Sequence, residues 1–197
     1  MNIKKILGRK YVLASRSERR KKLLKQVGLN FTIKDSNVGE INCSGFHPIK
    51  LVKLNSQNKA REIAVQLEEE IVIGADTIVV LGKEILGKPS NEKEAIKFLN
   101  MLSNKKHIVY TGFNIIDTRN GKEIFDYEKT VVYFRSLSSD EIKYYVRNHK
   151  PFDKAGSYGI QDDFGCLFIE KIIGDYYNVV GLPLAKLFIS LQNLLSK

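Results

Sequence analysis

The sequence has few residues that hold metal clusters or disulfides. Two cysteines, Cys43 and Cys166, and three histidines occur in the chain of 197 residues. Their positions do not match the ligand spacing of a zinc cluster. The simplest interpretation is a pair of reduced thiols in a cytosolic protein, and we therefore predict a cytoplasmic location.

Long apolar runs are absent as well. No run approaches the ~20 apolar residues that a membrane span requires, so we expect no membrane partner. The N-terminal stretch is basic, but its apolar part is short and is interrupted at residues 8–10, which argues against secretion. Repeats, low-complexity tracts and linkers are also lacking. We predict one domain over residues 1–197, a length that also suits a domain with two lobes around a cleft.

The composition indicates a globular protein with a basic surface. With 43% hydrophobic and 27% charged residues, the chain has enough apolar surface for a core. The formal net charge of +10 has two interpretations: a polyanionic partner such as nucleic acid, or a lysine-rich surface around a phosphate site. The lysines are spread along the whole chain, and no RNP-like or helix-turn-helix pattern occurs. The spread favours the second interpretation, so we expect no specific nucleic-acid partner.

Apolar periodicity predicts an α/β fold with a mixed sheet flanked by helices. Short apolar runs, several of them β-branched, predict strands at residues 11–14, 71–82, 108–117, 124–134 and 166–173. Capping residues and prolines predict helices that start near residues 15–17, 48, 91, 138 and 183. Two of these starts fit a capping box, namely Asn91 with Glu94 and Ser138 with Glu141.

The first long helix has two candidate caps. Ser15 with Glu18 fits a capping box, whereas Ser17 would cap the helix directly before Glu18. Gly28 predicts the end of the helix. The face that we expect to be buried carries Leu23, Leu24 and Val27.

The junction "LASRSERR" (residues 13–20) joins a strand to the start of this helix. A helix start exposes unpaired backbone N–H groups and the positive end of the helix dipole, which together attract phosphate. Arg16, Arg19 and Arg20 lie in or next to the first turns, where guanidinium groups can bind phosphate oxygens in pairs. A solvated basic face explains the same charge run, and the junction alone does not decide between the two.

Asp76 interrupts a strand whose neighbours look buried, in the sequence "GADT". A carboxylate there is costly unless it is paired, hydrogen-bonded or bound to a metal. It is either a structural aspartate at a bulge near Gly74, or a group that holds a divalent cation or accepts a proton from water. Glu40 is a candidate second oxygen ligand. Such hard ligands suit magnesium or manganese.

Two glycine-containing loops complete the polar candidates. "GKP" (residues 87–89) places Lys88 in a constrained turn, and "DKAGSYGIQ" (residues 153–161) combines two glycines with several polar side chains. Glycines allow a ligand to approach the backbone closely, and the Gln161 amide offers a donor and an acceptor to a base edge. Ordinary turn chemistry explains each loop equally well on its own.

Taken together, five motifs resemble those of the Maf family of nucleoside triphosphate pyrophosphatases, first named as septum-formation inhibitors. They occur in the family's order and at similar spacing, from Tyr11 to the last helix: "LASRSERR", "GADTIVV", "GKP", "DKAGSYGIQ" and "GDYYNVVGLPL". "GADT" with the glutamine of "GIQ" resembles the branch that acts on dTTP and UTP. The branch that acts on 7-methyl-GTP usually carries a different residue after the aspartate.

The resemblance implies a fold, a reaction and an assembly. The fold is expected to have a strongly curved mixed sheet and two lobes around a central cleft, similar to the inosine triphosphate pyrophosphatases. The reaction is cleavage between the α- and β-phosphates, which requires a divalent cation (Mg or Mn) and releases nucleoside monophosphate and pyrophosphate. The role is housekeeping of the nucleotide pool, with a link to cell-division arrest. The family also implies a homodimer.

The resemblance assigns roles by motif position. Asp76 matches the proton acceptor, Lys88 would stabilise developing charge, and Glu40 and Asp76 would hold the metal. Residues that match positions for choice of base are Arg19, Thr77 and Gln161. Residues that match the polar lining of the cleft are Ser15, Arg20, Glu40, Lys59, Lys88 and Asp153.

The chain departs from the family pattern at two positions. Glu18 stands where proline is usual, and we interpret it as completing the capping box with Ser15. Gly39 stands where a second glutamate often precedes the Glu40 position, which puts one metal contact in doubt.

Three alternative functions stay open: a non-catalytic nucleotide-binding regulator of septum formation, a member of the 7-methyl-GTP branch and a nucleic-acid-binding protein.

Overall fold

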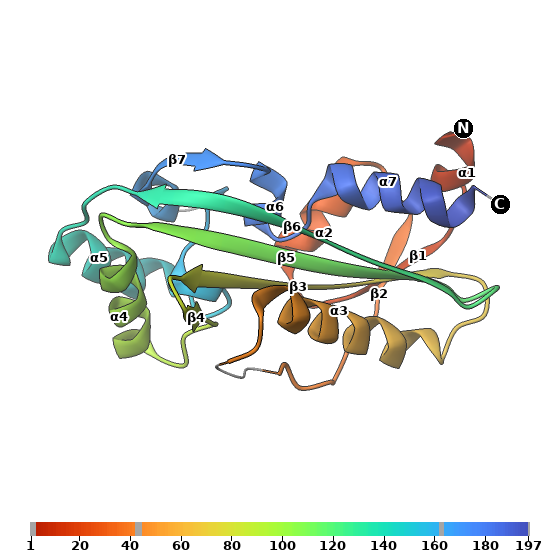
Figure 1. Ribbon diagram of the computed structural model, residues 1–197, viewed down its shortest axis with the longest axis horizontal. Coiled ribbons are helices and arrows are strands. Elements are labelled where there is room, and N and C mark those ends of the chain that lie inside the picture. The colour runs from red at the N-terminus through yellow and green to blue at the C-terminus, as the bar shows by residue number, and fades with distance from the viewer. Residues whose placement is uncertain (1–2, 42–44, 162–163, 197) are drawn as a thin grey trace. The chain divides into compact units, whose positions relative to one another are not determined.

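The computed structural model describes residues 3–41, 45–161 and 164–196 (Figure 1). Cys43, one of the two predicted thiols, lies outside these residues. The helices are α1 (Ile3–Leu7), α2 (Glu18–Gln26), α3 (Pro48–Ala64), α4 (Glu92–Leu102), α5 (Ser139–His149), α6 (Tyr176–Val180) and α7 (Leu184–Leu195), with 3-10 helices η1 (Ala155–Ser157) and η2 (Phe164–Phe168). The strands are β1 (Tyr11–Ala14), β2 (Phe31–Ile33), β3 (Ile71–Leu81), β4 (Glu84–Leu86), β5 (Lys106–Asp117), β6 (Lys122–Phe134) and β7 (Ile169–Ile173).

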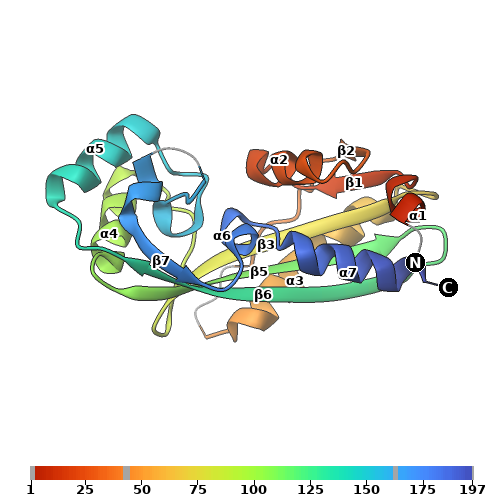
Figure 2. The same ribbon diagram turned by 90° about the horizontal axis from the view of Figure 1, so that it is seen from above.

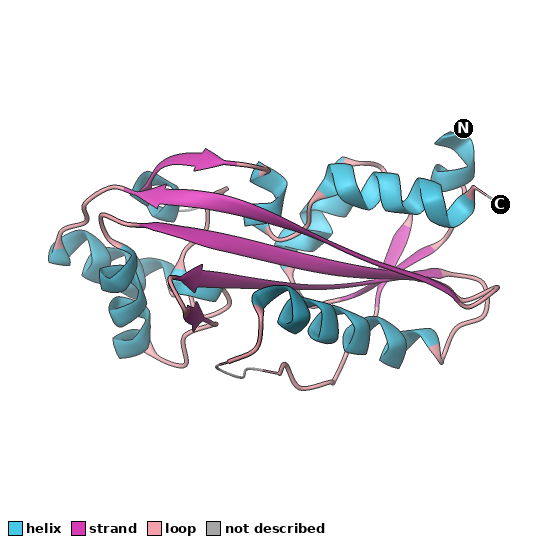
Figure 3. Ribbon diagram, viewed as in Figure 1, coloured by secondary structure: helices cyan, strands magenta, loops and turns pink. Residues whose placement is uncertain are grey.

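The described strands form one mixed sheet in the order β2-β1-β3-β5-β6-β7, with β4 paired to β3. Strand β1 is parallel to both β2 and β3, with Tyr11 opposite Phe31 and Ile71. Strands β4 and β7 are antiparallel to β3 and β6, respectively. Helices flank the strands (Figure 3). The predicted α/β class with a mixed sheet is thus confirmed, while the strong curvature stays a prediction.

The chain divides into two compact units. Unit 1 contains the residues up to Asp76, Thr111–Glu128 and the residues from Gly181 onward. Unit 2 contains Thr77–Tyr110 and Lys129–Val180. The long strands β3, β5 and β6 therefore contribute residues to both units. The single domain over residues 1–197 stays a prediction. Among the described residues, none of the helices combines the length and the hydropathy that a membrane span requires.

In unit 1, α3 packs closely against the strands. Its residues Ala60 and Ile63 form a buried cluster with Val12 of β1, Val72 of β3 and Ile116 of β5. Helix α7 lies on the opposite face of these strands (Figures 1 and 2). The close packing depends on Gly74, because a Cβ there would lie only 2.4 Å from the carbonyl oxygen of Ser56 in α3. As a result, α3 side chains reach the next α3-facing residue of β3, which is Asp76.

The start of α2 corrects one prediction. Ser17 caps the helix, since its Oγ accepts a hydrogen bond from Arg20 N at 3.4 Å. The capping box of Ser15 with Glu18 is therefore wrong. Glu18 is instead an exposed residue of the first turn that binds Lys21, and this hydrogen bond holds its pKa below the usual range. At the other end, Gly28 has φ +71 and ends the helix as predicted.

The buried face of α2 also differs in one residue. Leu23 and Leu24 are buried as predicted, but Val27 is 42% exposed. Val27 is the C-cap, where the backbone has left the helical geometry, so its side chain no longer follows the period of the buried face.

In unit 2, residues of α4 and α5 form a buried cluster with strand residues such as Val79, Val109 and Val132. Ser138 and Glu141 form the predicted capping box at the start of α5. The predicted box at α4 is only half right: Asn91 accepts from Glu94 N, but the Glu94 carboxylate binds Ser90. The strand predicted at residues 166–173 is also partly wrong, because η2 occupies residues 164–168 and pairing with β6 begins at Ile169.

Candidate active site

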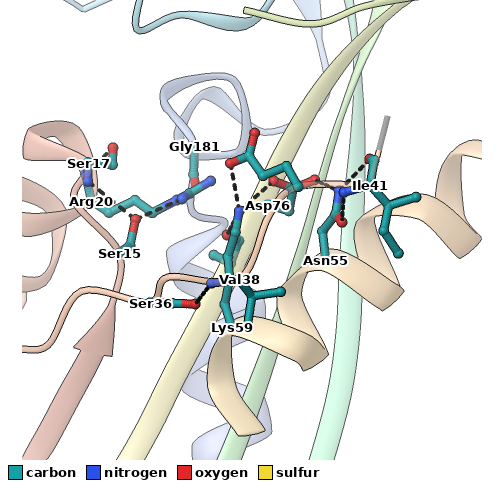
Figure 4. A network of polar contacts seen from close by, with 12 residues as sticks. Ser15, Ser17, Arg20, Ser36, Val38, Ile41, Asn55, Lys59, Asp76 and Gly181 are labelled. Carbon is teal, nitrogen blue, oxygen red and sulfur yellow. Dashed lines mark hydrogen bonds and ion pairs between the residues drawn. The ribbon is translucent and has the colours of Figure 1, made fainter. Parts of the chain in front are cut away.

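The centre of the site is a lysine between two carboxylates in unit 1 (Figure 4). Lys59 Nζ, from α3, lies 2.8 Å from Asp76 Oδ1 and 2.9 Å from Glu40 Oε1. Glu40 comes from the irregular segment after β2, and its side chain is 40% exposed. Asp76 is only 5% exposed. The predicted cost of a buried carboxylate is thus offset by a direct ion pair.

The second oxygen of Asp76 also has a protein partner. Asn55, one turn before Lys59 in α3, donates from Nδ2 to Asp76 Oδ2 at 2.9 Å. Asp76 is therefore bound at both oxygens by side chains of the same helix. The alternative interpretation had Asp76 satisfied by backbone N–H groups at a bulge, whereas the contacts of its two oxygens are with the side chains of Lys59 and Asn55.

The donor set can be tested against the metal that the resemblance implies. Among the described residues, no three His, Cys, Asp or Glu side chains gather as a metal site. Two carboxylates are nevertheless what Mg²⁺ commonly uses in nucleotide enzymes, where water and substrate phosphates complete its coordination. Glu40 Oε1 and Asp76 Oδ1 both lie within 3 Å of one positively charged atom, Lys59 Nζ. Their hard oxygens and their closeness fit Mg²⁺ or Mn²⁺ held together with a nucleotide.

The junction between β1 and α2 supplies a buried arginine beside this group. Arg20 donates from Nε to the carbonyl oxygen of Gly181 at 2.9 Å and from Nη1 to Ser15 Oγ at 3.0 Å. Burial lowers the pKa of Arg20 to about 10, and the negative charge of Asp76 opposes this shift. The guanidinium therefore stays charged at neutral pH. It gives the junction a fixed positive group, as a phosphate site requires.

The other two arginines of the junction differ from Arg20. Arg16 is exposed and pairs with Asp35 at 3.1 Å, in a surface ion pair of the kind that contributes little to stability. Arg19 is partly exposed in the first turns of α2. Of the three arginines, only Arg20 is buried, and phosphate binding by each of them stays a prediction. The role of Arg19 in choice of base stays a prediction.

In unit 2, the two predicted glycine-containing loops are neighbours. Gly156 N donates to the carbonyl oxygen of Gly87 at 3.0 Å, which joins the "DKAGSYGIQ" loop to the "GKP" turn. Gly156 has φ +68, and a Cβ there would lie 3.0 Å from Val79. A glycine is therefore needed at this position for both its backbone conformation and its packing. The contact brings the loop segments of Lys88 and Asp153 together.

The predicted side chains of unit 2 have different exposures. Lys88 is exposed, and so is Asp153, whose carboxylate lies 3.0 Å from Lys154 Nζ. Thr77 and Gln161 are partly buried. Their roles in substrate binding stay predictions, as does that of Lys88 in charge stabilisation.

Comparison with known proteins gives the family of the chain. The family model described as Maf-like protein matches residues 10–194. The chain belongs to the Maf family. A dTTP/UTP pyrophosphatase of Thermoanaerobacter sp. (strain X514) is 48% identical to this Maf chain over 180 residues, which cover 91% of this chain and 93% of that protein.

Two further relatives and one solved structure are similar to this Maf chain. The dTTP/UTP pyrophosphatase of Caldicellulosiruptor saccharolyticus is 46% identical over 190 residues, covering 94% of this chain and 95% of that protein. The dTTP/UTP pyrophosphatase of Methanosarcina barkeri is 44% identical over 180 residues, covering 91% of each. The structure of the Staphylococcus aureus Ham1 protein matches with a TM-score of 0.46 and 13% identity, covering 64% of this chain and 72% of that one.

The Maf motifs did not point to two buried polar residues. Asn55 was missed, although it stands four residues before Lys59 and therefore on the same side of the predicted helix, which was a usable signal. The other is His107 of β5, whose Nε2 lies 2.7 Å from Tyr158 Oη in the "DKAGSYGIQ" loop. Burial lowers the pKa of His107 to about 3 and raises that of Tyr158. This neutral pair fixes the loop to β5.

Proposed function

We propose that this Maf protein is a nucleoside triphosphate pyrophosphatase that hydrolyses dTTP and UTP to the monophosphate and pyrophosphate. The buried Asp76 carboxylate, bound by Lys59 and Asn55 and accompanied by Glu40, carries the proposal. A protein that only binds nucleotide does not need a buried carboxylate beside a phosphate site. Relatives with that activity, similar over nearly their full length, support the choice of substrate.

The proposed hydrolysis needs a base and fixed positive charge. The oxygen of a water molecule adds to the α-phosphorus while the bond to the oxygen that bridges to the β-phosphate breaks. Asp76 accepts the proton of the water. Arg20 and Lys59 bind phosphate oxygens by charge-assisted hydrogen bonds, Ser15 supports Arg20, and pyrophosphate leaves without a covalent enzyme intermediate.

The proposed function also involves a divalent cation. Asp76 and Glu40 would hold Mg²⁺ or Mn²⁺, which when bound would neutralise charge on the phosphate oxygens. Lys59 touches both carboxylates, so it would move toward the phosphates as the cation binds. A lysine is suited to such a change because its ammonium is a point charge on a flexible stem.

The remaining predicted residues are assigned to the substrate. Lys88 and Asp153 would contact the phosphates and the groups around them, with Lys88 stabilising charge that develops in the transition state. Thr77 and Gln161, with Arg19, would select the base. The homodimer, the cytoplasmic location and the link to cell-division arrest stay predictions.

Release of pyrophosphate tests this proposal directly. We expect release from dTTP and UTP, with less from CTP, GTP and 7-methyl-GTP, in the presence of Mg²⁺ or Mn²⁺. A protein that binds dTTP without releasing pyrophosphate would be the regulator instead. Release mainly from 7-methyl-GTP would assign it to the other branch. RNA or DNA binding with a steep salt dependence, in a protein without hydrolytic activity, would favour the nucleic-acid interpretation.

A further inference from the structure

Asn55 makes three hydrogen bonds that join two separate parts of the site (Figure 4). Its Oδ1 accepts from Ile41 N at 2.9 Å, and its Nδ2 donates to the Ile41 carbonyl oxygen at 3.1 Å. The same Nδ2 donates to Asp76 Oδ2 at 2.9 Å. Asn55 is 3% exposed, so these bonds form away from water, where a lost partner is costly.

The pair formed with Ile41 resembles one rung of a β-ladder. A primary amide offers a donor and an acceptor side by side, as a backbone residue does, and only asparagine and glutamine have this pattern. Ile41 follows Glu40 directly, in a segment without helix or strand. Glu40 and Ile41 are bound to α3 through Lys59 and Asn55, respectively. Earlier in the same segment, Ser36 and Asn37 are bound to α3 through Glu62.

The bond to Asp76 fixes the orientation of its carboxylate. Lys59 holds Oδ1 and Asn55 holds Oδ2, so rotation of the carboxylate about its bond to Cβ would break both contacts. Asn55 and Lys59 are one helical turn apart. A single face of α3 thus determines where both carboxylates of the site lie.

We propose that Asn55 is a positioning residue that holds the Asp76 carboxylate and the Glu40 segment in one arrangement in which they share a cation. The importance of this role for hydrolysis rests on the proposed function. The three hydrogen bonds of Asn55 are observed whether or not that function is correct. A purely structural amide would affect stability without changing how the two carboxylates act together.

The main variant is Asn55→Leu, which keeps the size of the side chain and removes all three hydrogen bonds. Ser56→Ala is its matched control, because Ser56 is fully buried in the same helix and its hydroxyl, among the described residues, donates only to the carbonyl oxygen of Lys53. Mn²⁺ binding to each protein is measured by electron paramagnetic resonance of the free ion, with a dTTP analogue that is not hydrolysed. We expect Asn55→Leu to weaken binding roughly 10- to 100-fold, as is typical when a partner of a metal ligand is lost, and Ser56→Ala to leave it unchanged.

A double-mutant cycle with Glu40→Gln separates positioning from a general loss of stability. If Asn55 acts by placing Glu40, the Asn55→Leu change costs much less Mn²⁺ affinity once Glu40 is already neutral. The proposal would be overturned if the double variant lost Mn²⁺ affinity by the product of the two single-variant factors. It would also be overturned if Asn55→Leu bound Mn²⁺ as tightly as wild type, or if the wild type bound no Mn²⁺. Hydrogen exchange of the Ile41 amide gives a second measurement, since it should become faster in Asn55→Leu and not in Ser56→Ala.

Folding and function are kept apart in this design. Asn55→Ala removes the same three bonds with a smaller side chain, and replaces Asn55→Leu if the latter does not fold. If neither variant folds, Asn55 acts in folding and the proposal is overturned. Metal affinity and amide exchange need no turnover. A wild-type protein that binds Mn²⁺ but releases no pyrophosphate would therefore refute the proposed function. The positioning role of Asn55 could still be tested in that case by Mn²⁺ affinity and amide exchange.

Discussion

The ammonium of Lys59 lies 2.8 Å from the carboxylate of Asp76, and both side chains are almost completely buried. An ion pair at this depth is costly to break from either side, because the group that remains has an uncompensated charge. Glu40 binds the same ammonium, so the three groups together carry one negative charge when all are ionised. This net negative charge favours binding of a cation. The Lys59 ammonium, however, lies between Asp76 Oδ1 and Glu40 Oε1, the two oxygens that would coordinate the ion.

The first prediction is that Lys59 and a divalent cation compete. Lys59→Met keeps a long apolar stem and removes the ammonium that repels the ion. We expect nucleotide-free Lys59→Met to bind Mn²⁺ roughly tenfold more tightly than wild type, a change of about 1.4 kcal/mol, while its turnover of dTTP falls. Isothermal titration calorimetry measures the affinity. Weaker Mn²⁺ binding in Lys59→Met would mean that the lysine organises the carboxylates for the ion instead.

The second prediction is that Asp76→Asn abolishes nearly all turnover in a protein that remains folded. An amide accepts no proton and is a poor metal ligand, so pyrophosphate release should fall by roughly three to four orders of magnitude. Lys59 would keep Glu40 as a partner, which limits the loss of stability. Circular dichroism checks the fold. A variant with a tenth of wild-type activity and the same metal requirement would exclude Asp76 from the proposed role.

A third prediction compares Arg20→Ala with Lys88→Ala. Each should lower kcat/KM by a similar factor for dTTP, UTP and CTP, because each loses a charge-assisted contact of about 1.5–3 kcal/mol to phosphate. The variants should differ in stability. Arg20 is buried and binds the Gly181 carbonyl, so only its removal should lower the melting temperature markedly, whereas Lys88 is exposed. A loss confined to one base would show that the side chain reads the base.

The fourth prediction concerns pH and His107. The unfolded chain protonates this histidine below about pH 6.5, whereas burial keeps it neutral in the folded protein down to about pH 3. Between these values the unfolded state binds the extra proton, so stability falls as the pH decreases, by up to about 1.4 kcal/mol per pH unit from this group. His107→Gln can still bind Tyr158 but does not titrate. Its melting temperature should decline less between pH 6.5 and 4 than that of wild type, and equal slopes would contradict this assignment.

Local signals in the sequence were enough to predict much of the fold and the members of the site. Pro48 predicted the start of α3, because proline suits the first turn of a helix, and Gly28 predicted the end of α2. Asp76 stood out because a carboxylate is unusual inside a β-branched strand. These signals lie within a few residues of the feature that they predict.

Contacts between residues that are distant in the sequence could not be predicted from such local signals. The bonds of Asn55 to Ile41 and Asp76 depend on how closely α3 lies on β3, which the sequence indicates only through the absent side chain of Gly74. Ser17 caps α2, while the Ser15 hydroxyl accepts from the Arg20 guanidinium and from Ser17 N. Local capping rules do not include such competition for a hydroxyl group.

The last prediction is that Gln161 determines the preference for pyrimidines. Uracil and thymine present acceptor, donor and acceptor along their pairing edge, and an amide matches one donor and one acceptor of that edge. Cytosine reverses part of this pattern and would leave a buried polar group unpaired, at a cost of ~1–3 kcal/mol. Purines carry a second ring and a different pattern of donors and acceptors along their pairing edge. We therefore expect kcat/KM to decrease from dTTP and UTP to CTP and then to GTP and 7-methyl-GTP.

Gln161→Ala should flatten this order more than it lowers turnover of the best substrate, because the amide distinguishes bases and does not take part in the hydrolysis. The decisive measurement is kcat/KM for the five nucleotides in wild type and variant. Gln161→Glu is the matched control, since it keeps the size and an acceptor but loses the donor, and it should alter the order without removing it. An equal loss for all five nucleotides in Gln161→Ala would place Gln161 at the phosphates, or in support of the fold, and would leave the choice of base to Thr77 and Arg19.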